Sequence, residues 1–244
     1  MATKLVPEKT MVLPPSHAER WGIFVALGLL LTVPYFTIQH YVLFPARVVP
    51  LTQLDRLVPL FQPAVYVYLS LDLLLTLPLL LARDSRNLRQ MAFGFALITC
   101  VSHLVFFLWP TAIPWLVSSR EVTNPLLRMV MAVDTRLNAC PSLHASLAIY
   151  CALCSSRLLK SSKRRAGVWL WTFLILVSTL FAKRHVVLDL IAGGALGVAV
   201  YTALFRGQPS EAVSSEAMPA ALPAREPAEQ ALTRPSSKAQ TSQD

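Results

Sequence analysis

A histidine and an aspartate stand four residues apart in one of the most apolar parts of the chain, within the stretch LFAKRHVVLDLIAGG that runs from Leu180 to Gly194. If this stretch is helical, His185 and Asp189 share a face, and the carboxylate can accept a hydrogen bond from one ring nitrogen. That bond fixes the tautomer and leaves the other nitrogen as a nucleophile or base. Because ionisable residues are costly near hydrocarbon, we expect a functional pair rather than one that only neutralises itself inside a helix bundle.

A second histidine lies in the stretch NACPSLHAS, from Asn138 to Ser146. Pro141 and Ser142 suit the first turn and the cap of a helix, which places His144 in that first turn. The free amides and the dipole of such a helix start favour an anion, so a phosphate oxygen could bind there while His144 faces the leaving group. The alternative is a helix start at the membrane interface with an incidental histidine.

The composition indicates an integral membrane protein. Of the 244 residues, 55% are hydrophobic and only 14% are charged, a combination typical of membrane proteins. The formal net charge is +9, but the basic residues lie mostly between apolar runs. They therefore indicate orientation signals and contacts with anionic lipid head groups, and we expect no nucleic-acid partner.

The apolar runs predict an all-α, polytopic fold, a bundle of six transmembrane helices. Each run has roughly the length that a membrane crossing requires. The predicted helices cover residues 21–43, 62–82, 91–109, 142–159, 166–182 and 185–206. Lysine and arginine flank one set of helix ends more heavily, above all in RLLKSSKRR between the fourth and fifth helices. This bias predicts that both termini are cytoplasmic.

Three regions follow from this pattern. Residues 1–20 form a cytoplasmic N-terminal segment, residues 21–206 form the six-helix membrane domain, and residues 207–244 form a disordered cytoplasmic tail, because they have almost no large apolar side chains. With alternating spans, His144 begins the fourth helix and His185 begins the sixth on the same, non-cytoplasmic side. Both histidines and Asp189 can therefore meet at one membrane face.

These motifs resemble a known family. PSLHAS looks like the Pro-Ser-x-His motif of the type 2 phosphatidic acid phosphatase superfamily, and RHVVLDLIAGG looks like its His-x-x-x-Asp motif. The longer form DTRLNACPSLH, which contains Asp134 and Asn138, is similar to the branch that includes inositol phosphorylceramide synthases and their bacterial relatives. The resemblance covers roughly residues 60–205.

The resemblance implies a mechanism. His185 would attack phosphorus and form a phosphohistidine, Asp189 would orient His185, and His144 would protonate the leaving oxygen. The family's Lys-x6-Arg-Pro motif is absent, and the Ser-Arg expected six residues before the nucleophile reads Ser178-Thr179. The predicted phosphate-binding residues are instead Arg120, Arg128, Ser142, Lys183 and Arg184, with Asp134 and Asn138 as supporting residues.

The predicted activity is the hydrolysis or transfer of a phosphate group on a phospholipid or sphingolipid. Water as the acceptor makes the protein a lipid phosphatase, and an alcohol such as an inositol or sugar head group makes it a phosphotransferase. We expect no cofactor or metal, and membrane lipids as the only other partners, with the oligomeric state left open. The short loops and compact size fit a bacterial inner membrane, with the site facing the periplasm.

Two other classes of function stay open at this stage. The first is an intramembrane metal hydrolase with His144, His185 and Asp189 as zinc ligands. The second is a transporter or scaffold in which the His–Asp pair relays protons. No H-E-x-x-H motif and no inverted repeat is evident in the sequence.

Overall fold

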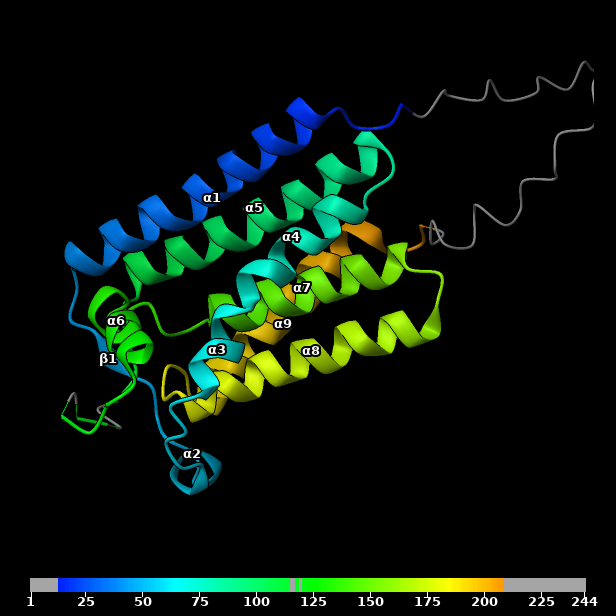
Figure 1. The fold of residues 1–244 in the computed structure, drawn as a ribbon. Coiled ribbons are helices and arrows are strands. Elements are labelled where there is room, and N and C mark those ends of the chain that lie inside the picture. The colour runs from blue at the N-terminus through cyan, green and yellow to red at the C-terminus, as the bar shows by residue number, and fades with distance from the viewer. Residues whose placement is uncertain (1–12, 115–116, 119, 209–244) are drawn as a thin grey trace, which may run out of the picture.

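The structure, a computed structural model, describes residues 13–114, 117–118 and 120–208 (Figure 1). Within them the chain is mostly helical, which confirms the predicted fold class. The helices are α1 (His17–His40), α2 (Gln53–Leu57), α3 (Ala64–Leu69), α4 (Leu71–Leu81), α5 (Ser85–Leu108), α6 (Pro125–Val133), α7 (Leu143–Leu158), α8 (Ser162–Phe181) and α9 (Val187–Phe205). Residues 1–12 of the predicted N-terminal segment and residues 209–244 of the predicted tail lie outside the described residues.

Five helical segments are long and apolar enough to cross a membrane, so the chain is a multi-pass membrane protein. They are His17–His40, Ala64–Leu81, Ser85–Leu108, Ser162–Phe181 and Val187–Phe205. The 16-residue helix α7 is shorter and lies among α4, α5, α8 and α9. The start of α1 and the end of α9 lie at the same end of the bundle (Figure 1). The count of six spans and the cytoplasmic side of the termini stay predictions.

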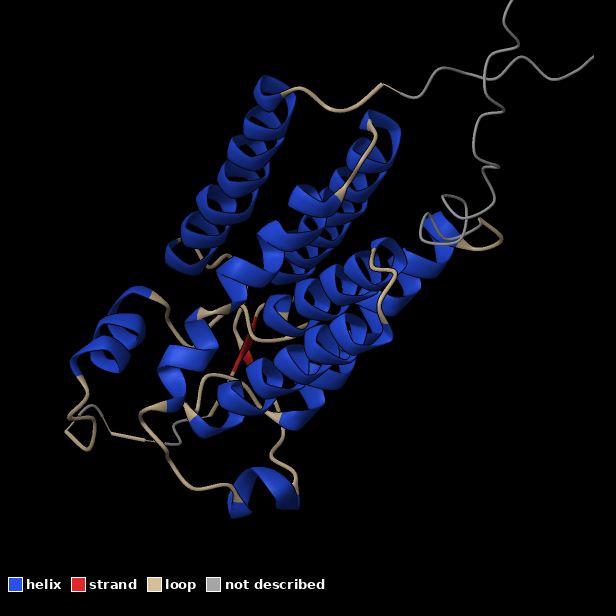
Figure 2. Cartoon of the chain, turned by 45° about the vertical axis from the view of Figure 1, so that its right-hand side comes forward, coloured by secondary structure: helices blue, strands red, loops and turns tan. Residues whose placement is uncertain are grey.

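The other end of the bundle carries elements that the hydropathy pattern does not predict. The short helices α2 and α6 lie there, together with the parallel two-residue strands β1 (Arg47–Val48) and β2 (Thr111–Ala112). Figure 2 shows the strands where the connecting loops gather. Helix α2 has only five residues, too few to leave an apolar period, and the nine-residue helix α6 is much shorter than a membrane crossing.

Several helix boundaries differ from the prediction, among them the starts of α1 at His17 and of α5 at Ser85, and two of the differences have a clear physical reason. The predicted helix 62–82 is divided into α3 and α4 at Ser70, whose hydroxyl donates to the Val67 carbonyl at 2.6 Å and accepts from the Trp171 indole at 2.9 Å. Helix α8 begins at Ser162, four residues earlier than predicted. The apolar run stops at the basic residues of this first turn. Because lysine and arginine are good helix formers, the helix nevertheless includes them.

Helices α7 and α9 approach each other closely because α9 has glycine at the contact. A Cβ atom on Gly193 would collide with the carbonyl oxygen of Ser142, and one on Gly197 would collide with that of Ser146. Small residues at helix interfaces allow this backbone approach in membrane proteins. The contact fixes the start of α7 beside the start of α9, which are the two places where the predicted catalytic histidines lie.

We expect Gly193→Ala to destabilise the protein by about 1–3 kcal/mol, because the added methyl group has to push α7 away from α9. Gly167→Ala is the matched control, since a Cβ atom at Gly167 of α8 meets no atom within 4 Å. Alanine favours a helix over glycine, so the control variant should be as stable as the wild type or slightly more stable. Thermal denaturation of both purified variants in detergent measures the difference, and equal midpoints would contradict the close contact.

Candidate active site

His185 and Asp189 form the predicted contact, although not as two residues on one helix. Helix α9 begins at Val187, so His185 lies in the preceding loop. Its Nδ1 atom still lies 3.2 Å from the Asp189 Oδ2 atom. Both carboxylate oxygens of Asp189 also accept from the Val186 amide at 3.2 Å. The fully buried carboxylate therefore closes the first turn of α9 and orients the imidazole at the same time.

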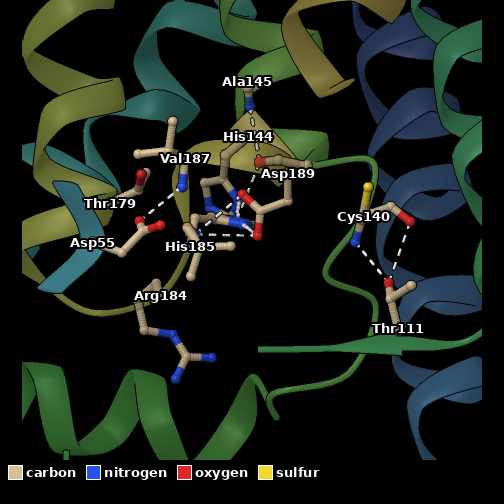
Figure 3. A network of polar contacts seen from close by, with 12 residues as sticks. Asp55, Thr111, Cys140, His144, Ala145, Thr179, Arg184, His185, Val187 and Asp189 are labelled. Atoms are coloured by element: carbon tan, nitrogen blue, oxygen red, sulfur yellow. Dashed lines mark hydrogen bonds and ion pairs between the residues drawn. The ribbon is translucent and has the colours of Figure 1, made fainter. Parts of the chain in front are cut away.

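His144 lies in the first turn of α7, as the sequence predicts. Its Nδ1 atom is 3.1 Å from the Nε2 atom of His185, and the two ring centroids are 5.0 Å apart (Figure 3). The Ser142 hydroxyl lies 3.3 Å from the same Nε2 atom. The Ser142 amide donates to the Asp189 carbonyl oxygen at 3.1 Å. Two residues from the start of α7 thus contact one nitrogen of His185, and Asp189 of α9 contacts the other.

Ser142 caps α7 as the sequence predicts, but Pro141 does not lie in the first turn. Ser142 is the N-cap, and its hydroxyl accepts from the Ala145 amide at 3.2 Å. Pro141 precedes the cap instead of lying in the first turn. The amides of Leu143 and His144 precede the first hydrogen bond within the helix, from Ser146 to Ser142. These amides are the donors that an anion can use at a helix start.

Two tyrosines support His144 and the predicted supporting residue Asp134. The Tyr68 ring stacks on His144, with the centroids 4.6 Å apart and the planes at 27°. The Tyr35 hydroxyl donates to Asp134 at 2.6 Å, and the Tyr68 hydroxyl lies 3.4 Å from the same carboxylate. Neither tyrosine was predicted to be part of the site, because their partners lie far away in the sequence.

Asp134 also holds Arg184. The guanidinium donates to the Asp134 carboxylate at 2.9 Å and to the carbonyls of Asp134 and Thr135 at 2.5 and 3.0 Å. The Arg184 side chain is only 4% exposed, and its Nε atom has no hydrogen-bond partner among the described residues. Burial acts to raise the pKa of the Asp134 carboxyl, but the Arg184 guanidinium and the Tyr35 hydroxyl outweigh burial and hold this pKa below its ordinary value.

Lys183 and Asp55 fasten the loop that carries His185. The Lys183 backbone has a φ of 57°, and its ammonium group donates to the carbonyls of Val58 and Asp55. The Asp55 carboxylate accepts from the Val187 amide at 2.9 Å and from the Thr52 amide at 2.8 Å. Asp55 was not predicted to be part of the site. The pattern Thr52-x-x-Asp55 is a capping box, which is typical of a helix start but does not encode a contact with α9.

The predicted phosphate-binding residues do not gather around the histidines. Ser142 contacts His185, whereas Arg184 extends away from the two rings (Figure 3). Arg120 is exposed in the turn before α6, and Arg128 is exposed on α6, where it donates to the Val122 carbonyl at 2.8 Å. The roles of these arginines and of Lys183 in binding phosphate stay predictions.

Asn138 shapes the loop before α7. Its φ is 57°, in the left-handed region that asparagine tolerates better than most residues. Its side-chain amide donates to the Tyr35 carbonyl at 3.1 Å. The predicted supporting residues Asp134 and Asn138 therefore both contact Tyr35 and join this loop to α1.

An apolar cavity of about 300 Å³ lies beside the histidines. It is lined by α1, α3, α4, α6 and α7, and the lining residues include Tyr35, Tyr68, Val130, Leu147, His144 and His185. A second cavity, of about 430 Å³, lies on the other side of the Asp134–Arg184 pair and is lined by Arg136, Lys183 and Arg184 among apolar residues. The site thus has one apolar and one basic neighbouring space.

The donor geometry does not suit a metal ion. Asp189 and His144 contact opposite nitrogens of His185, so the three side chains do not point to a common centre. No group of three or more His, Cys, Asp or Glu side chains within residues 13–114, 117–118 and 120–208 is arranged to hold a metal. This geometry gives no support to the metal-hydrolase alternative.

The fold and the site define a multi-pass membrane protein with two imidazoles in contact beside an apolar cavity. In a comparison with protein-family models, the model of the PAP2 superfamily matches residues 49–203. The chain therefore belongs to the PAP2 superfamily. Membership supports a membrane enzyme of the phosphatase type and suggests a lipid phosphate as its substrate. Comparisons with curated proteins and with solved structures found no match.

Removing one partner of the buried Asp134–Arg184 pair should cost about 3–5 kcal/mol, because the other charge is left buried without compensation. We expect this loss for Asp134→Ala and for Arg184→Ala. The double variant Asp134→Leu/Arg184→Met removes both charges and should recover much of the lost stability. Denaturation of the three variants in detergent tests this. Additive losses in the double variant would show that the two side chains do not stabilise each other.

Proposed function

We propose that the protein cleaves or transfers the phosphate group of a lipid through a phosphohistidine on His185. The observation that carries this proposal is the contact at 3.1 Å between the imidazole of His144 in the first turn of α7 and that of His185 in the loop before α9. The Nδ1 atom of His185 is occupied by Asp189, so Nε2 is the nitrogen left to act as the nucleophile. Ser142 and the start of α7 supply hydrogen-bond donors next to it.

The reaction has two steps. In the first, the Nε2 lone pair of His185 forms a bond to phosphorus, the bond from phosphorus to the ester oxygen breaks, and His144 gives a proton to that oxygen. In the second, water or an alcohol loses a proton to His144 and attacks phosphorus, and the N–P bond breaks. Both histidines then have their initial protonation states, and the phosphate has moved to the acceptor oxygen.

Transfer requires the phosphoryl group to enter between His185 and its present neighbours His144 and Ser142. Charge on the phosphoryl oxygens is then met by the free amides at the start of α7, which are fixed before the reaction begins. Arg184, buried nearby with one unpartnered nitrogen, is a further source of positive charge. Lys183, Arg120 and Arg128 remain candidates for this role.

The apolar cavity beside His144 suits the hydrocarbon part of a phospholipid or sphingolipid phosphate. Water as the acceptor gives a phosphatase. The second candidate is a head-group phosphotransferase of the inositol phosphorylceramide synthase type, which the resemblance of DTRLNACPSLH favours. In either case we place the site at the outer face of a bacterial inner membrane.

Purified protein incubated with phosphorylated lipids, with and without inositol, should release phosphate or form a new phospholipid, and both products are measured together. We expect His185→Ala to abolish both products and to prevent the covalent labelling of the protein by radioactive lipid phosphate. His144→Ala should slow turnover about 10²–10⁴-fold, as expected when a general acid is lost. The label should be acid-labile, as a phosphohistidine is.

His40→Ala is the matched control, because His40 is exposed and its Nδ1 atom contacts only the Phe36 carbonyl of its own helix. This variant should keep full activity. Full activity of His185→Ala would contradict the phosphohistidine mechanism. Activity that is lost in EDTA and restored by zinc would contradict it as well and would favour a metal hydrolase.

A further inference from the structure

The end of the bundle opposite the histidines has a large basic cavity. It has a volume of about 610 Å³ and lies between the starts of α1 and α8 and the ends of α4 and α7. Its polar lining comes from Arg20, Arg83, Lys160, Ser161 and Arg164. The histidines lie near the start of α7, whereas this cavity lies at its end, so the two sites are separated by the length of that helix.

One of the four cations is fixed in the wall. Arg20 is half-buried, and its guanidinium donates to the carbonyls of Leu79 and Ala82 at the end of α4, the latter at 2.6 Å. The other three, Arg83, Lys160 and Arg164, are exposed. Among the described residues, no hydrogen bond or ion pair occupies their side chains. Three positive charges therefore face the cavity without a partner of opposite sign.

The carboxylates closest in sequence are already occupied. Glu19 binds Arg89 at 2.7 Å and Ser85 at 2.8 Å. Asp84 caps α5 and accepts from the backbone and side-chain amides of Asn87 at 2.8 and 2.7 Å. Neither acid lines the cavity. Within residues 13–114, 117–118 and 120–208, no acidic side chain therefore neutralises the positive charge of the cavity wall.

The start of α8 adds to the same charge imbalance. Ser161 is the N-cap, but its side chain makes no capping hydrogen bond, and no acidic residue lies in the first turn. Lys163, Arg164 and Arg165 occupy that turn instead. Cations are unfavourable at this end of a helix dipole, and an anion is favourable. The positive-inside rule alone explains why these residues are basic. It does not explain why they line a cavity or why the helix start lacks a capping side chain.

We propose that this cavity binds the phosphate-bearing head group of an anionic membrane phospholipid, separate from the phosphate that reacts at His185. The cations and the amides of α8 meet the phosphate oxygens, and the leucines at the ends of α4 and α7 contact the glycerol and the first methylene groups. Basic pockets between membrane helices are suited to anionic head groups. This inference does not depend on the proposed reaction.

The test compares two triple variants that lose the same charge at the same end of the protein. The cavity variant, Arg83→Ala/Lys160→Ala/Arg164→Ala, loses the three exposed cations that line the cavity. The neighbouring variant, Arg86→Ala/Lys163→Ala/Arg165→Ala, loses three cations that lie beside the cavity. Arg20 is kept in both because it holds α1 against α4. Binding of dioctanoyl phosphatidylglycerol to the full chain in neutral detergent is measured by native mass spectrometry, with dioctanoyl phosphatidylcholine and inorganic phosphate as comparison ligands.

We expect the wild type to bind phosphatidylglycerol at least ten-fold more tightly than phosphatidylcholine. The cavity variant should lose this preference, and the neighbouring variant should keep it to within about three-fold. Equal losses in both variants would show general surface attraction and overturn the proposal. Displacement of the lipid by millimolar inorganic phosphate would show a simple anion site and overturn the assignment to a lipid. Unchanged thermal midpoints without lipid verify that both variants are folded.

Discussion

The backbones of α7 and α9 are so close that the carbonyl oxygens of Ser142 and Ser146 occupy the space of a side chain at Gly193 and Gly197. The geometry of the active site depends on this approach of two backbones. It allows the Ser142 amide to donate to the Asp189 carbonyl, and it brings His144 and His185 into contact. A wider separation would leave each imidazole beside its own helix, because neither ring is long enough to compensate for a shift of the backbone.

The histidines, the aspartate and most of the membrane helices could be predicted because their signals are local or periodic. Apolar length reveals a span, and alternation of spans places His144 and His185 at one end. The contact between His185 and Asp189 was predicted for a helix and occurs in a helix N-terminal cap instead. Both arrangements bring residues four apart together, so the prediction of the contact was right although the predicted backbone was not.

Asp55, Tyr35 and Tyr68 could not be predicted as parts of the site, because each acts through a partner in a distant part of the chain. Asp55 binds the amide of Val187, and Tyr35 of α1 binds Asp134. No spacing in the sequence encodes such contacts. Arg184 is a similar case, because its position next to His185 does not indicate that its guanidinium binds the carboxylate of Asp134.

Helix α1 packs against the core and α5 with mostly half-buried apolar side chains, and polar contacts hold it near its ends. Of its 24 residues only Leu27 and Gln39 are buried, and Gln39 binds the Val133 carbonyl at 3.0 Å. Between these attachments the helix forms one wall of the apolar cavity while its outer face meets hydrocarbon. Lateral pressure from a surrounding bilayer would press on this outer face and change the width of the cavity, so lipid composition would act on the site mechanically as well as chemically.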